Sequence, residues 1–395
     1  MPPGFRRRAT VARILIAAIL AVVVATPASG AWRQFHAGPA RLGISSDRSL
    51  SPSNIGRLRV KWSRATGNSA EGINSSAAVV DGRVFVGSDD GRLYAFGVGG
   101  ARLWAKPVGG PVRSSPAVSD GVVYVGSDHG HLQARAVGSG SLRWSRTLNG
   151  VISSSPLVAE HRVYIGTRGG TFYALKASTG AIVWKKSVWS VWDAAAYRGG
   201  VVYVGSDRSR VWAFDADTGA RRWVAPVWGR VRSTPAVTRD RVYIGTDQGR
   251  VYALSRRTGH RIWSSAAVQP GNGFVRCAPA VAAGLVVVSV GLTTNPMDGK
   301  VRAFHVRRGG LAWTGEMADY ATSSPAFVHG MFLVGSFDHR LYAFGAKHGA
   351  ELWTSGWQFQ GGFFDRGISS SPAITAGRIF IGVRDGRLYA LGLPG

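Results

Sequence analysis

Residues 113–144 contain four short segments that return along the whole chain. In order they read Arg113-Ser-Ser-Pro-Ala-Val, Val122-Val-Tyr-Val-Gly-Ser, His131-Leu-Gln-Ala and Leu142-Arg-Trp. Each segment is rich in β-branched or aromatic residues and is bounded by Gly, Asp or Ser, which is typical of a short strand between turns. Thr-Gly pairs such as Thr179-Gly180 mark the last hairpin of a unit. The pattern predicts one four-stranded antiparallel unit per copy.

The tryptophan that ends each unit sets the period of the repeat. Its copies stand 39 to 50 residues apart, at Trp62, Trp104, Trp144, Trp184, Trp223, Trp263, Trp313 and Trp353. A period near 40 with four strands per unit is the signature of a β-propeller blade. Because a single blade is too small to bury its own faces, we expect these tryptophans to pack between blades rather than to form an aromatic ligand platform. The repeating glycines would let an aromatic ring lie directly on backbone.

The two ends of the repeat are complementary. Trp62 precedes any inner strand, and the last unit stops at Leu391, after its third strand, without a tryptophan. We therefore expect the N-terminal strand to supply the outer strand of the last blade, which leaves no free sheet edge. The predicted fold is all-β: an eight-bladed β-propeller of four-stranded antiparallel blades over residues 55–395, closed by an N-terminal strand.

The unit Val-Tyr-Val-Gly-Ser-x-x-Gly-x-Leu-Tyr-Ala-Leu-x-x-x-Thr-Gly-x-x-x-Trp resembles the repeat of the pyrroloquinoline quinone (PQQ) dehydrogenase-like propellers. The opening from Trp32 to Leu58 is similar to the start of that superfamily, with residues 32–54 as an N-terminal extension. The resemblance implies the PQQ-repeat fold, which non-enzymatic members share. For the alcohol dehydrogenases among them it implies PQQ, a calcium ion, an aspartate base, a tryptophan under the cofactor and a pair of adjacent cysteines.

The cysteine content departs from that dehydrogenase pattern. Cys277 is the one cysteine, so the chain has no adjacent pair, no intramolecular disulfide and no Cys-x-x-Cys-His haem motif. Candidate calcium ligands exist but are scattered along the chain, whereas calcium needs several oxygen ligands together. They are Glu71, Asn74, Asp193, Asp319 and Asp365. We therefore assign no metal site and no catalytic residue.

Residues 1–31 look like an export signal. Arg6, Arg7 and Arg8 precede an apolar run of about residues 11–25, and small residues follow at 27–31. The run is short for a membrane span and no second one follows, so we expect a secretory signal peptide cut near Gly30 or Ala31. The mature protein is then expected to be secreted or held in the periplasm or cell envelope, with no membrane span.

The charge of the chain bears on its partners. The formal net charge is +27, and a protein this basic attracts anionic surfaces. An anionic small molecule or an envelope component is the expected partner; a generically basic surface is the alternative reading. No cluster resembles a nucleic-acid motif, so we expect no nucleic-acid partner. We expect a monomer.

A polar position at the start of every inner strand offers a site at the channel mouth. The residue before each Ser-Pro or equivalent run is Asn74, Arg113, Ser153, Asp193, Arg232, Arg276, Thr322 or Ser369, and its predecessor is usually apolar. Alternation along a strand would send the polar set to the channel. Three arginines there could bind a carboxylate or a phosphate; a hydrated channel in which Asp193 balances an arginine is equally compatible.

Residues that break the repeat strengthen this choice, because packing does not explain them. They are an insertion at Gly291–Gly299, an aromatic link at 357–366, and the replacement of Ser-Ser-Pro by Ala194-Ala-Ala beside Trp189 and Trp192. The candidate ligand-binding residues are therefore Asn74, Arg113, Trp192, Asp193, Arg232, Arg276, Asp365 and Arg366.

Three functions fit these features. The preferred one is a binding or interaction scaffold for an anionic ligand or partner at the channel mouth. The first alternative is a PQQ- and calcium-dependent alcohol or sugar dehydrogenase. The second is an envelope-assembly propeller subunit, although no cysteine follows the signal to carry a lipid anchor.

Overall fold

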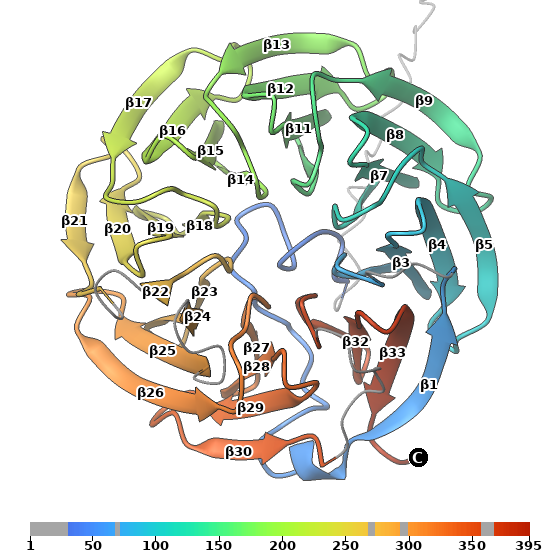
Figure 1. The fold of residues 1–395 in the computed structure, drawn as a ribbon, viewed down its shortest axis with the longest axis vertical. Helices are drawn as coiled ribbons and strands as arrows, with labels where there is room; N and C mark the ends of the chain where they lie inside the picture. Colours follow the sequence, from blue (N-terminus) through green and yellow to red (C-terminus); the bar gives the residue numbers. More distant parts are fainter. Residues whose placement is uncertain (1–30, 68–71, 268–272, 293–298, 357–366) are drawn as a thin grey trace, which may run out of the picture.

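The computed structural model describes residues 31–67, 72–267, 273–292, 299–356 and 367–395. Their strands form eight antiparallel sheets arranged as a ring (Figure 1). This confirms the predicted eight-bladed propeller. The innermost strand of each blade is only two or three residues long, because it ends where the chain turns back near the axis. Within the described ranges, no helix is long and apolar enough to cross a membrane.

The first four blades follow one another along the chain. Blade 1 contains β2 (Ala78–Val80), β3 (Arg83–Gly87), β4 (Arg92–Gly97) and β5 (Arg102–Pro107). Blade 2 contains β6 (Ala117–Ser119), β7 (Val122–Gly126), β8 (His131–Ala136) and β9 (Leu142–Thr147). Blade 3 contains β10 (Leu157–Ala159), β11 (Arg162–Gly166), β12 (Thr171–Lys176) and β13 (Ile182–Ser187). Blade 4 contains β14 (Ala196–Arg198), β15 (Val201–Ser206), β16 (Arg210–Asp215) and β17 (Arg221–Pro226).

The remaining blades complete the ring. Blade 5 contains β18 (Ala236–Val237), β19 (Arg241–Gly245), β20 (Val251–Ser255) and β21 (Arg261–Ser264). Blade 6 contains β23 (Ala280–Ala282), β24 (Leu285–Leu292), β25 (Gly299–His305) and β26 (Leu311–Met317), and β22 (Gly273–Phe274) adds to β24. Blade 7 contains β27 (Ala326–Val328), β28 (Met331–Gly335), β29 (Leu341–Gly345) and β30 (Glu351–Thr354). Blade 8 contains β31 (Ala373–Thr375), β32 (Arg378–Gly382) and β33 (Arg387–Gly392).

The N-terminal strand closes the ring as predicted. After the short helix η1 (Ile55–Arg57), β1 (Arg59–Ala65) pairs antiparallel with β33, and Trp62 stands opposite Ala390. Blade 8 therefore takes its outer strand from the start of the chain, and no blade is left with three strands. This pairing joins the two ends of the propeller (Figure 1).

The repeat tryptophans lie between neighbouring blades. Trp144 packs on Gly180 of the next blade, whose φ of 69° is in the left-handed region, and an added Cβ there would come within 2.6 Å of the indole. The indole Nε1 of Trp144 donates to the Ala177 carbonyl at 2.8 Å. Six other tryptophans make the same bond to the next blade, from Trp62, Trp104, Trp184, Trp223, Trp263 and Trp313.

A second repeating glycine, found at the end of the second strand in seven blades and replaced by Ser289 in blade 6, receives an aliphatic side chain instead of an aromatic one. Val112 of blade 2 lies on Gly87 of blade 1, and Ile152 of blade 3 lies on Gly126 of blade 2. The expectation that glycine accommodates an aromatic ring is therefore correct for the turn glycines and wrong for these strand glycines. Neighbouring blades come closer together toward the channel axis, so the space between them there has room only for the smaller side chain.

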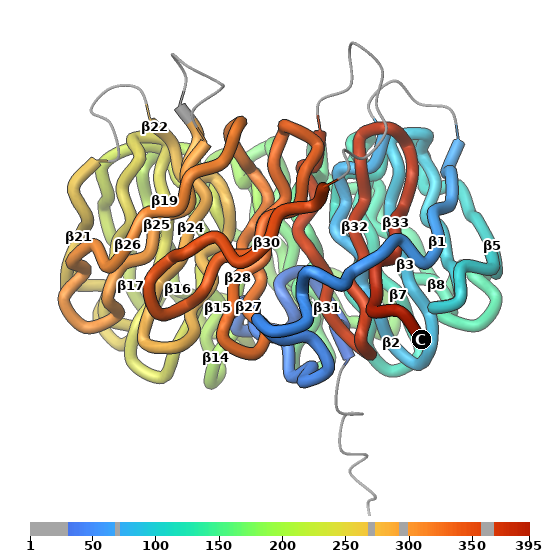
Figure 2. Tube along the Cα trace, turned by 90° about the horizontal axis from the view of Figure 1, so that it is seen from below, coloured from blue at the N-terminus to red at the C-terminus, as the bar shows by residue number. Residues whose placement is uncertain are grey.

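One end of the channel is filled by the segment Trp32–Ser45, which we call the plug. Figure 2 shows it at the lower end of the ring. Its backbone, with the side chains of Gln34 and Ser45, hydrogen bonds to the innermost strand of every blade, at Val79, Val118, Val158, Tyr197, Val237, Val281, Phe327 and Ile374. The N-terminal extension is thus a structural part of the propeller, and a channel site is reached from the opposite mouth.

Candidate functional site

The mouth opposite the plug is lined by the residues that precede each inner strand. In blade 2, Val112 is buried and Arg113 follows it at the mouth. Blade 4 is different from the prediction by one residue: Val191 is the buried aliphatic, lying on Gly166 of blade 3. Trp192 therefore occupies the mouth position and Asp193 takes the next place, where other blades have serine. The assignment of Asp193 to the mouth ring was wrong because it assumed a loop of constant length.

The mouth arginines are matched by aspartates that were not among the predicted site residues. Arg113 Nη1 lies 2.7 Å from Asp128 Oδ2, and its Nε lies 3.5 Å from Asp89 Oδ2. Each aspartate follows the Gly-Ser or Gly-Thr that ends a second strand. This places it against the arginine of the same or the next blade.

The same pairing is found in blades 4 to 6. Arg232 Nε lies 3.0 Å from Asp207 Oδ1, and its Nη1 lies 3.4 Å from Asp247 Oδ2. Arg276 Nε lies 2.9 Å from Asp247 Oδ1. The arginines thus form a belt of ion pairs and not a ring of bare cations, and the repeated Gly-Ser-Asp was the sequence signal for it.

On the side of blades 8 and 1 the mouth residues are the neutral side chains Ser369 and Asn74. Ser369 Oγ donates to Asn74 Oδ1 at 2.7 Å, and Asn74 Nδ2 donates to Asp89 Oδ2 at 2.8 Å. Asn74 therefore extends the belt from Asp89 to the last blade. The ion-paired mouth arginines Arg113, Arg232 and Arg276 come from blades 2, 5 and 6.

Trp192 is the centre of the belt on blades 3 to 5. Its Nε1 donates to Asp207 Oδ2 at 2.7 Å. Two guanidinium groups lie over its ring, that of Arg168 at 3.7 Å and that of Arg232 at 4.3 Å from the centroid. Arg168 was not among the predicted site residues; its Nε donates to Ser153 Oγ at 3.3 Å. Arginine at the position that holds aspartate in other blades was the signal that could have found it.

Two further tryptophans stand beside this cluster and are exposed. Trp189 is 51% exposed and Trp228 is 56% exposed, and each has an arginine over its ring. The guanidinium of Arg208 lies 3.9 Å from the Trp189 centroid, and that of Arg250 lies 4.9 Å from the Trp228 centroid. Neither indole is needed to fill a blade interface. We call Trp189, Trp192, Trp228, Arg168 and Arg232 the mouth cluster.

The backbone of Trp189 is strained. Its φ is 68°, in the left-handed region, where the corresponding loops of blades 2, 3 and 5 have Gly110, Gly150 and Gly229. The loop into blade 4 is also one residue shorter than those loops. A bulky residue in this conformation costs about 1–2 kcal/mol. The packing of the blades explains neither the exposed ring nor the strained backbone of Trp189.

Asp193 lies deeper than the mouth cluster and approaches the plug. Desolvation raises its pKa to about 6, although the Ala194 amide, the Thr234 hydroxyl and the Arg41 guanidinium all favour the charged form. Arg41 is fully buried and its pKa falls to about 9, again by desolvation, with Asp193 acting against the shift. The Arg41 guanidinium donates to the carbonyls of Phe35, Pro156 and Ala195. Asp193 therefore belongs to the base of the channel.

The proposed calcium ligands do not come together. Asn74 bonds to Asp89, Asp193 faces Thr234, and Asp319 accepts from the Tyr320 amide in the loop before blade 7. Glu71, Asp365 and Arg366 lie outside the described residues. Among the residues that are described, no three His, Cys, Asp or Glu side chains are grouped to hold a metal ion.

A family model described as outer membrane protein assembly factor BamB matches residues 31–188 and 187–329, which is more than half of the chain. The chain therefore belongs to this family of PQQ-repeat propellers, which confirms the resemblance seen in its repeat. No curated protein matches the chain.

Solved structures with this fold come from several kinds of protein. BamB from Moraxella catarrhalis aligns with a TM-score of 0.71 at 19% identity, covering 85% of this chain and 99% of that one. The quinohemoprotein alcohol dehydrogenase ADHIIG from Pseudomonas putida HK5 aligns at 0.78 and 16% identity, covering 92% and 80%. A europium-containing methanol dehydrogenase aligns at 0.77 and 15% identity, covering 92% and 98%. At these identities the likeness shows the fold alone.

Proposed function

We propose that the protein is a binding propeller of the cell envelope, which holds an anionic ligand or the acidic segment of a partner on the mouth cluster. The observation that carries the proposal is Trp189, which is half exposed and held at a φ of 68°. A strained residue with an exposed ring indicates a use outside the fold. Its place under the Arg208 guanidinium, in the loop that leads to Trp192, indicates what that use is.

The mouth cluster combines the two kinds of contact that an anionic ligand needs. Guanidinium groups bind carboxylates and phosphates through paired, charge-assisted hydrogen bonds. Exposed indoles supply large, rigid contact area at little entropic cost. The ion-pair belt lowers the free charge at the mouth but holds Arg168 and Arg232 in place over Trp192. A ligand therefore meets donors that are already oriented, which reduces the cost of binding.

The dehydrogenase alternative has weaker support from this site. Its calcium would need several oxygen ligands together, and the described candidates lie in separate blades. A planar cofactor would need an open indole face, but the Trp192 ring already has two guanidinium groups over it. Among the residues that the structure describes, no group of side chains at this mouth fits PQQ and calcium.

A location in the envelope rests on the export signal expected in residues 1–31, of which residues 1–30 lie outside the described residues. The family description adds that assembly of outer membrane proteins is a role found in this family. If this chain has such a role, an acidic segment of another assembly protein is the ligand that the mouth cluster would take. This is the version of the proposal that unites the two non-enzymatic hypotheses.

Binding to a defined acidic polymer tests the proposal. Fluorescently labelled poly-L-glutamate should bind the mature protein, and the affinity should fall as salt is raised. Arg168→Gln should weaken binding by about tenfold, because one charge-assisted contact is worth roughly 1.5–3 kcal/mol. Arg102→Gln, an exposed arginine on the outer strand β5, is the matched control and should change nothing. Equal losses in both variants would mean that the overall charge is responsible and would refute the site.

A parallel titration with PQQ and calcium tests the alternative. Saturable quenching of tryptophan fluorescence, followed by dye reduction with an alcohol, would replace the binding proposal by the dehydrogenase. We expect neither response.

A further inference from the structure

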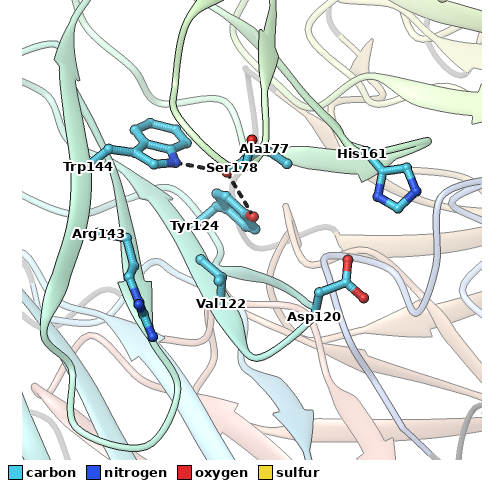
Figure 3. A pocket seen from close by; sticks show the side chains of 8 residues that line it. All are labelled: Asp120, Val122, Tyr124, Arg143, Trp144, His161, Ala177 and Ser178. Atoms are coloured by element: carbon cyan, nitrogen blue, oxygen red, sulfur yellow. Dashed lines mark hydrogen bonds between the residues drawn. The ribbon is translucent and has the colours of Figure 1, made fainter.

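A pocket on the face of the plug lies between blades 2 and 3, away from the mouth cluster. It has a volume of about 630 Å³ and is lined by Asp120, Val122, Tyr124, Arg143, Trp144, His161, Ala177 and Ser178 (Figure 3). Its floor is aromatic: Tyr124 and Trp144 both donate to the Ala177 carbonyl, at 3.2 and 2.8 Å. Asp120, at the tip of the β6–β7 hairpin, supplies a carboxylate at its edge.

The equivalent cleft between blades 3 and 4 shows what normally fills this space. There Arg162 stands at the position of Val122 and pairs with Asp217 of blade 4. The surrounding residues are the same, with Tyr164 and Trp184 donating to the Ala216 carbonyl at 3.1 and 3.0 Å. The cleft of blade 3 is therefore the pocket of blade 2 with an arginine in it.

Other clefts repeat this arrangement. Arg241 of blade 5 donates to the Val306 carbonyl, and to that of Arg307 at 3.1 Å. Arg378 of blade 8 donates to the Val98 carbonyl. In blade 4 the strand position is Val201, and Arg256 enters from blade 5 instead, donating to the Arg198 carbonyl at 3.4 Å. At the blade 2 pocket both positions are small, Val122 on one side and Ala177 on the other.

The geometry points to a binding site for an alkylguanidinium group in this pocket, either a free small molecule or an arginine side chain of a peptide. The Asp120 carboxylate lies at the edge of the pocket as an acceptor, and the Ser178 carbonyl corresponds in the repeat to the Arg307 carbonyl that accepts from Arg241 in blade 5. The Tyr124 and Trp144 rings offer surfaces for a cation. Asp120 lies close enough to Tyr124 that its charge helps burial to raise the pKa of that phenol to about 12. In the blade 3 cleft a guanidinium hydrogen bonds to the tyrosine and acts in the opposite direction.

The other two charged or titratable residues of the pocket leave this site open. Figure 3 shows Arg143 and Asp120 on opposite sides of Tyr124, and Arg143 is exposed on the outer strand. His161 has a φ of 56°, in a turn position where blades 2 and 4 have Gly121 and Gly200. A left-handed histidine at the rim of a pocket is a second strained residue that blade packing does not require.

Binding of two probes, measured by isothermal titration calorimetry, tests the site. Agmatine represents the free molecule, and a capped arginine tripeptide represents the peptide source; the same tripeptide with citrulline is the uncharged control. We expect one site for an arginine-type probe and none for citrulline. Binding of agmatine but not of the tripeptide identifies a small-molecule site, and the reverse preference identifies a peptide site.

The decisive variants either place an arginine in the blade 2 pocket or remove the arginine from the blade 3 cleft. Val122→Arg should abolish binding by supplying the missing side chain, and Ala177→Arg should do the same from the other side, as Arg256 does in blade 4. Asp120→Asn should weaken binding by about tenfold. Arg162→Ala should empty the blade 3 cleft and raise the number of sites from one to two. Unchanged binding in a folded Val122→Arg or Ala177→Arg protein, or no binding by the wild type, overturns the inference.

Discussion

Replacing Asp193 by asparagine should make the protein more stable at neutral pH. Asparagine keeps the shape and the acceptor oxygen that takes the Ala194 amide at 2.8 Å, but removes the charge. Desolvation raises the pKa of Asp193 from 3.8 to about 6. A folded-state pKa above the unfolded one means that ionising Asp193 costs stability, fully above pH 6 and not at all below pH 3.8. Two pKa units correspond to about 3 kcal/mol, which is an upper value because the side chain is only partly buried.

Urea unfolding of the two proteins between pH 3.5 and pH 8 measures this effect. The free energy of unfolding of the Asp193→Asn variant should exceed that of the wild type by up to about 3 kcal/mol at pH 8. This difference should vanish as the pH falls from 6 to 4. Titration of His36, whose pKa burial lowers to about 4, cancels because both proteins have it. A constant difference between the curves, or a less stable variant at pH 8, would refute the account of Asp193 as a buried charge under strain.

Other predictions concern packing, backbone strain and charge. Trp184→Ala should destabilise the fold by about 3–5 kcal/mol in urea unfolding. Trp228→Ala, which removes an exposed ring, should change the free energy of unfolding by less than about 0.5 kcal/mol. Equal losses in the two variants would contradict the division of the tryptophans into packing and mouth groups. His161→Gly should stabilise the protein by about 1 kcal/mol, since glycine adopts the left-handed conformation freely. The opposite substitution at the equivalent turn of blade 2, Gly121→His, should destabilise the protein by a similar amount. A destabilised His161→Gly protein would show that the histidine side chain stabilises the turn. Arg41→Met should lower the melting temperature, because three buried carbonyls lose their donor; an unchanged melting curve would mean that the plug is not part of the cooperative fold.

The fold could be predicted because its determinants repeat. Seven of the eight repeat tryptophans meet the same glycine turn of the next blade, so one unit of the sequence specifies the contacts of nearly all the others. The last repeat lacks an outer strand after Leu391, and an additional strand around Trp62 precedes the first repeat. These two features together predicted how the ring is closed. The plug could not be predicted in this way, because Trp32–Ser45 does not repeat and its hydrogen bonds go to strands from 47 to 329 residues away.

The candidate site was predictable only in part, for reasons of register and pairing. The prediction placed Asp193 at the mouth, but the structure has Trp192 at the mouth and Asp193 one position deeper. The loop that precedes them is one residue shorter than in other blades, so each side chain after it is shifted by one position. The prediction named the arginines of the mouth, but their partners Asp128, Asp207 and Asp247 follow a different strand of the same or neighbouring blades. Such pairs are adjacent only once the blades are stacked, and a one-dimensional pattern does not show them.

The most direct test of the mouth cluster is a pair of measurements on one variant, Trp189→Gly. The unfolding free energy should rise by about 1 kcal/mol as the left-handed backbone is relieved, while the affinity for labelled poly-L-glutamate should fall. Leu142→Gly, which removes an equally exposed apolar side chain from β9, should leave the affinity unchanged. A Trp189→Gly protein that is more stable and binds the polymer as tightly as the wild type would contradict the claim that this residue is strained in order to bind.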